Sequence, residues 1–141
     1  MMAYLIGAVL ALAVVGLAAI VQLDRDGAFY PTVLVVVASY YVLFAVMGGS
    51  TRALMVESLI MTAFLVVAVV GFRQNLWLVA AALGAHGIMD SFHGRVVTNP
   101  GVPAWWPPFC MTFDIVAAGY LAWLLWRRHA TLLTQQKPLI Y

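Results

Sequence analysis

Five side chains that can bind a metal ion or move a proton lie within one short part of the sequence. His86, Asp90 and His93 are separated by four and three residues, so a helix would carry all three on one face. Cys110 and Asp114 follow, again four residues apart. Neutral imidazoles and carboxylates are usual ligands of zinc and non-haem iron, and they are also common general acids and bases. The spacing therefore predicts either a metal site or an acid–base site.

The chain around these residues is almost entirely apolar. Of its 141 residues, 65% are hydrophobic and 9% are charged, which lies outside the balance typical of soluble domains. Several apolar runs are long enough to cross a bilayer. The sequence thus predicts a multi-pass protein of the cell membrane, folded as a single transmembrane domain, in which ionisable groups are a functional-site hypothesis by default. The net charge of +2 gives no reason to expect nucleic-acid binding.

Five membrane-spanning helices are expected to position these residues, because polar or proline-rich breaks separate the apolar runs. The fourth and fifth are divided by a segment that holds four of the six prolines and a pair of tryptophans. Such a segment predicts an interfacial loop and not a helix. The predicted all-α bundle has helices at about 2–23, 29–47, 54–72, 76–93 and 109–126, the loop at 94–108 and a surface-lying tail at 127–141.

The basic residues predict which way the bundle faces. If the C-terminus is cytoplasmic, the cytoplasmic segments hold five Lys and Arg residues and the opposite ones hold two. The positive-inside rule then favours an N-outside, C-inside bundle. The alternation of spans places Glu57, Asp90, His93 and Asp114 toward the non-cytoplasmic end, with His86 about 10 Å deeper than His93. Glu57 is expected in the first turn of its helix, where it is either an interfacial carboxylate favoured by the helix dipole or a further member of the site.

An enzyme could use these residues in two ways. In the first, His86, Asp90, His93 and Asp114 hold zinc or iron, with Cys110 as a further ligand, and a metal-activated water hydrolyses its substrate. In the second, no metal is bound and an imidazole shuttles a proton beside a desolvated carboxylate, which suits an isomerase or cyclase. In both cases the predicted catalytic residues are His86, Asp90, His93, Asp114 and Glu57, and the predicted partners are the lipid bilayer and a lipid-soluble small molecule.

Functions without catalysis stay open beside these two. The polar residues could fix the register of the helices in a non-catalytic accessory subunit. The chain could also form a homo-oligomer or belong to a larger membrane complex. His86, flanked by Gly84 and Gly87, could instead ligate haem or a chlorophyll-type tetrapyrrole, because a flat macrocycle needs small neighbours. Transport is the least favoured function, because five short spans leave little room for alternating access.

The last two predicted spans carry a recognisable combination of motifs. His86-Gly87-Ile88-Met89-Asp90-Ser91-Phe92-His93 is followed by the proline-rich segment from Pro100 to Pro108 and then by Cys110 and Asp114. In this part the chain resembles small uncharacterised bacterial multi-pass membrane proteins in which an H-x-x-x-D-x-x-H helix precedes a Pro-rich loop and a Cys/Asp helix. The resemblance implies a common site and names no substrate.

Overall fold

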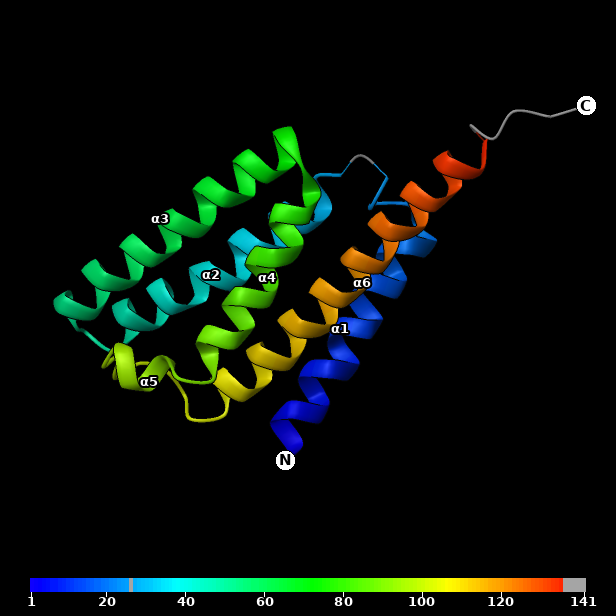
Figure 1. Cartoon of the computed structure of the whole chain (residues 1–141). Coiled ribbons are helices and arrows are strands. Elements are labelled where there is room, and N and C mark those ends of the chain that lie inside the picture. The colour runs from blue at the N-terminus through cyan, green and yellow to red at the C-terminus, as the bar shows by residue number, and fades with distance from the viewer. Residues whose placement is uncertain (26, 136–141) are drawn as a thin grey trace, which may run out of the picture.

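The computed structural model describes residues 1–25 and 27–135, and these residues form helices without any strand. The axes of the longer helices are roughly aligned, and each of these helices runs antiparallel to the one before it in the chain. The N-terminus and the end of the last helix therefore lie at opposite ends of the molecule (Figure 1). In chain order the helices are α1 (Met2–Ile20), α2 (Phe29–Met47), α3 (Thr51–Gln74), α4 (Leu76–Asp90), α5 (His93–Val96) and α6 (Trp106–Gln135).

Four of these helices, α1, α2, α3 and α6, are long and apolar enough to cross a membrane. Large apolar side chains such as Leu12, Leu59 and Val66 point outward along them and are more than half exposed. A hydrocarbon surround would solvate such a surface well, whereas water would not. The remaining apolar helix, α4, has 15 residues and is therefore about 22 Å long. This length is shorter than the ~30 Å hydrocarbon core of a typical bilayer.

Helix α6 organises the packing, because α1 and α4 lie against it while α2 pairs with α3. Two glycines allow the close approach to α6. A Cβ atom at Gly7 of α1 would collide with the carbonyl oxygen of Phe109. One at Gly87 of α4 would lie 2.9 Å from the carbonyl oxygen of Met111 and 3.2 Å from Cβ of Asp114. Small residues at helix contacts are the usual means of close packing in membranes.

The predicted helix at 29–47 is confirmed, and those at 2–23 and 54–72 differ from the structure only at their ends. Helix α1 stops at Ile20, and the chain turns through Gln22, whose φ is 64°. Helix α3 begins earlier than predicted, at Thr51, because the Ser50 hydroxyl accepts a hydrogen bond from the backbone N–H of Ala53 at 3.2 Å. This side-chain cap satisfies a backbone donor that would otherwise have no partner.

The prediction of one continuous helix over 76–93 is wrong. Helix α4 ends at Asp90, and His93 begins the separate short helix α5. At the break the Ser91 hydroxyl donates to the carbonyl oxygen of Ile88 at 2.6 Å, a local bond of the kind that competes with regular helix. His93 therefore leaves the face that it was expected to share with His86 and Asp90.

The predicted limits of the loop at 94–108, the last helix and the tail are also wrong. Helix α6 begins at Trp106 and includes Pro107 and Pro108, since the first turn of a helix tolerates prolines that lack an N–H group. It continues past Trp126 to Gln135, so most of the expected surface tail is helical. Residues 136–141, and with them Lys137, lie outside the described residues.

Candidate polar site

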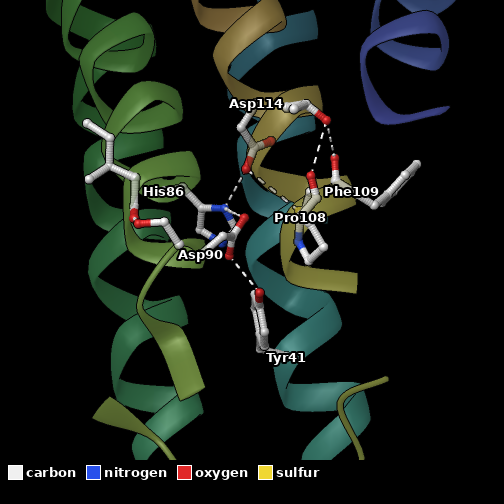
Figure 2. Close-up of polar contacts among 10 residues, drawn as sticks. Tyr41, His86, Asp90, Pro108, Phe109 and Asp114 are labelled. Atoms are coloured by element: carbon white, nitrogen blue, oxygen red, sulfur yellow. Dashed lines mark hydrogen bonds and ion pairs between the residues drawn. The ribbon is translucent and has the colours of Figure 1, made fainter. Parts of the chain in front are cut away.

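A buried polar cluster joins α4 and α6 in the interior of the bundle. Nδ1 of His86 lies 2.6 Å from Oδ2 of Asp114 and 3.7 Å from Oδ2 of Asp90. The other oxygen of Asp90 accepts a hydrogen bond from the Tyr41 hydroxyl at 2.6 Å. Figure 2 shows these contacts between side chains of α2, α4 and α6, three elements that are far apart in the sequence. The predicted convergence of His86, Asp90 and Asp114 is therefore present.

Cys110 completes the cluster. Its thiol donates to Oδ2 of Asp114 at 3.7 Å, and the potential ligand atoms of His86, Asp90, Cys110 and Asp114 all lie within 4.8 Å of one another. All four residues are buried, with relative exposures of 2% or less. Each helix contributes two of them at a spacing of four residues, which places both on the same helical face.

The cluster retains unused polar capacity. Nε2 of His86, Oδ2 of Asp90 and Oδ1 of Asp114 are buried and have no hydrogen-bond partner within the described part of the chain. The ion pairs of these carboxylates there involve imidazole and neither Lys nor Arg. Since buried charged groups are normally paired or bound to a metal, these unpartnered atoms could bind a cation or additional protons.

Glu57 and His93 form a second buried contact beside the cluster. Nε2 of His93 lies 2.9 Å from Oε1 of Glu57, and the side-chain amide of Asn99 donates to the same oxygen at 3.0 Å. Glu57 is 1% exposed and lies in the second turn of α3, not in the first turn of its helix as predicted. Neither Glu57 nor His93 belongs to the group that could share one metal ion with His86.

Tyr41 connects the two polar groups. Its ring stacks on the His93 ring with centroids 4.0 Å apart, its hydroxyl reaches Asp90, and its backbone carbonyl accepts a hydrogen bond from Asn99 at 3.0 Å. Neither Tyr41 nor Asn99 was predicted as a site residue. The sequence did offer a weak indication for Tyr41, since a tyrosine in the middle of an apolar helix needs a hydrogen-bond partner for its hydroxyl.

Comparison with models of protein families, with curated proteins and with solved structures gives no match for this chain. One imidazole, two carboxylates and a thiol in close contact can bind a transition-metal ion, and an imidazole held by a carboxylate can also transfer a proton.

Proposed function

We propose that this protein is a membrane-embedded enzyme with a metal site formed by His86, Asp90 and Asp114, with Cys110 as a further ligand. The observation that supports this most is the closeness of four buried ligand groups, all within 4.8 Å, that have no Lys or Arg partner among the described residues. A divalent cation would offset the carboxylate charges and engage the unpaired atoms of His86, Asp90 and Asp114.

The donor set favours zinc or iron over a tetrapyrrole. Imidazole, carboxylate and thiolate are all ligands that zinc accepts, and imidazole with carboxylate also suits non-haem iron. The His86 ring has two close neighbours, Asp114 at 2.6 Å and the ring of Phe64 with its centroid 4.9 Å away. A macrocycle at His86 would have to displace these neighbours, whereas a single ion would not.

When bound, a zinc or iron ion supplies Lewis acidity and lowers the pKa of a coordinated water, which suits hydrolysis. The chain itself fixes the ligands. Tyr41 holds Asp90 by a hydrogen bond of 2.6 Å, and the surrounding apolar helices keep bulk water out. Because the site is buried within apolar helices, its substrate is a lipid-soluble molecule.

A second candidate function is proton transfer without a metal, as in an isomerase or cyclase. The 2.6 Å contact between His86 and Asp114 favours it, because a carboxylate at this distance orients an imidazole and stabilises its protonated form. In this mechanism His86 takes a proton from the substrate and returns it at another atom. The same residues thus serve both candidate functions, and the metal content of the protein distinguishes the two functions.

We also propose that the chain crosses the membrane five times, with the N-terminus outside and the C-terminus in the cytoplasm. The support is geometric, since α4 packs against both α3 and α6 and leads from the end where α3 finishes toward the end where α6 begins (Figure 1). Its 15 residues are fewer than the ~20 of a typical span, but seven of them, including His86 and Asp90, are buried against the other helices. In this orientation the polar cluster lies toward the non-cytoplasmic end.

Metal analysis of the purified protein tests the metal site. We expect a stoichiometric transition metal in the wild type and its loss in His86→Ala, Asp90→Asn and Asp114→Asn. Each substitution should lower the metal affinity by more than the ~10–100-fold that is typical for removing an outer-shell partner. His129→Ala and Asp24→Asn are matched controls, because both residues lie outside the cluster and are expected to leave the metal unchanged.

A wild-type protein that takes up neither zinc nor iron after reconstitution would contradict the metal site. Turnover of a lipid extract by this metal-free protein, lost in His86→Ala, would then support the proton-transfer candidate.

A further inference from the structure

An apolar groove runs along the outside of the bundle between α1, α2 and α6. It encloses a cavity of about 420 Å³, within the ~300–1,000 Å³ range of small-molecule sites. Helix α2 packs on α3 and α1 on α6, so α2 and α6 contact each other only sparsely and leave the groove between them. Its walls include Val14 of α1, Val33 and Val36 of α2, and Phe109 and Phe113 of α6.

The groove and the polar cluster share a wall. Cys110 lines the groove, and its sulfur also lies 3.7 Å from Oδ2 of Asp114. It is the one cluster residue that also contributes to this cavity, within the described part of the chain. A molecule in the groove would therefore be separated from the carboxylates by little more than a thiol.

The shape and polarity of the groove suit a hydrocarbon chain. Residues from Phe29 to Tyr40 line it along one face of α2, a length of about 16 Å at ~1.5 Å per residue. Thr32 adds no free polar group, since its hydroxyl donates to the carbonyl oxygen of Ala28 at 2.9 Å. Tyr40 and Trp106 lie at the end nearest the 97–105 loop, with ring centroids 4.7 Å apart. Tyrosine and tryptophan rings combine an apolar body with a polar O–H or N–H group, which suits contact with the polar end of a lipid.

We propose that the groove binds the hydrocarbon chain of a membrane lipid and holds it against Cys110, so that the polar cluster acts on a lipid with a long apolar chain. This proposal rests on the proposed function for its catalytic part and on the groove itself for its binding part. The chain would lie along α2, with its headgroup near Tyr40 and Trp106.

Photolabelling tests the binding part. The wild type is reconstituted in liposomes with a fatty acid that carries a diazirine on its chain, and the labelled residues are identified by mass spectrometry. We expect labels on the groove-facing residues of α1, α2 and α6. Val36→Trp should fill the groove and reduce these labels roughly tenfold, the equivalent of about 1.4 kcal/mol. Val66→Trp is the matched control, since Val66 is an equally apolar, exposed residue of α3, a helix that does not line the groove.

Two outcomes would overturn the proposal. One is labelling spread evenly over all lipid-facing helices and unchanged by Val36→Trp. The other is loss of a dimer in Val36→Trp, which would identify the groove as an interface between two copies of the chain. Metal content is measured on the same samples. Metal without groove labelling would refute only the groove, and groove labelling without metal would refute only the metal site.

Discussion

Tyr41 is the residue through which α2 reaches the cluster, and its hydroxyl can be removed without changing the ring. Its hydrogen bond to Asp90 is 2.6 Å long and fully buried. If Asp90 is a metal ligand, Tyr41→Phe should weaken metal binding about 10–100-fold, as loss of an outer-shell partner typically does. The ring stacking on His93 would remain. Competition with a chelator of known affinity measures the change.

Tyr30→Phe provides the control for this prediction. Tyr30 lies on the same helix and is 1% exposed, but its hydroxyl has no hydrogen-bond partner in the described part of the chain. Removing an unsatisfied buried hydroxyl should leave the metal affinity unchanged and the stability unchanged or higher. Equal metal affinities in the two variants would show that Tyr41 does not support a ligand.

The sequence predicts the cluster residues better than their partners. His86, Asp90, Cys110 and Asp114 stand out because polar residues at helical spacing are rare in an apolar chain. Tyr41 and Asn99 act through contacts with residues 49 and 58 positions away in the sequence. Helical periodicity carries no information about such distant pairs. The pairing of His93 with Glu57 was missed for the same reason.

At the level of elements, Gly87 sets the distance between α4 and α6. An alanine there would place its Cβ 2.9 Å from the Met111 carbonyl oxygen and 3.2 Å from Cβ of Asp114. Overpacking of this kind typically costs about 1–3 kcal/mol, against a gain of about 1 kcal/mol in helix propensity. We expect Gly87→Ala to lower the midpoint of thermal unfolding in detergent and to reduce metal content, because α4 moves away from Asp114.

Gly84→Ala is the control for Gly87→Ala, because it changes the helix propensity of α4 without overpacking the contact with α6. It lies one turn earlier in α4, and its Cβ would meet only the Ala118 side chain, at 3.9 Å. The substitution should therefore be neutral or stabilise the protein by up to about 1 kcal/mol. If Gly87→Ala behaved in the same way as Gly84→Ala, the close contact between α4 and α6 would not matter for the site.

Helix limits were harder to predict than helices. The apolar runs identify all of the long helices, but hydrophobicity does not report the side-chain bonds that begin or end them. The Ser50 hydroxyl caps the N-terminus of α3, and the Ser91 hydroxyl donates to the carbonyl oxygen of Ile88 where α4 ends. The error at Asp90 matters most, because it moves His93 from the face of His86 to a contact with Glu57.

For the whole molecule, the order and alternation of the apolar segments indicate an α-helical bundle and place the polar residues near one end of it. They do not indicate which helices are neighbours. The packing of α4 and α1 on α6, and the groove that this leaves beside α2, depend on close contacts at Gly87 and Gly7. Small residues are frequent in this chain, so their positions alone do not reveal which of them meet another helix.

Whether the two termini lie on opposite sides of the membrane depends on whether α4 crosses it. Four described arginines, Arg25, Arg73, Arg127 and Arg128, lie near the end of the bundle where α3 and α6 finish, and Arg52 and Arg95 lie near the other end. The positive-inside rule places the first end in the cytoplasm. The native Cys110 is buried, so single cysteines introduced at the exposed positions Gln74 and Thr98 report the two ends separately.

In intact cells a membrane-impermeant maleimide should label Thr98→Cys but not Gln74→Cys. Permeabilised cells should show both labels, because Gln74 then becomes accessible from the cytoplasmic side. The reverse pattern would invert the bundle and place the polar cluster toward the cytoplasm. Equal labelling of both positions in intact cells would mean that α4 begins and ends on the same side of the membrane. With 15 residues, α4 is shorter than the four helices that are long enough to cross it. The cluster would then be reached from that side, and the five-pass topology would be wrong.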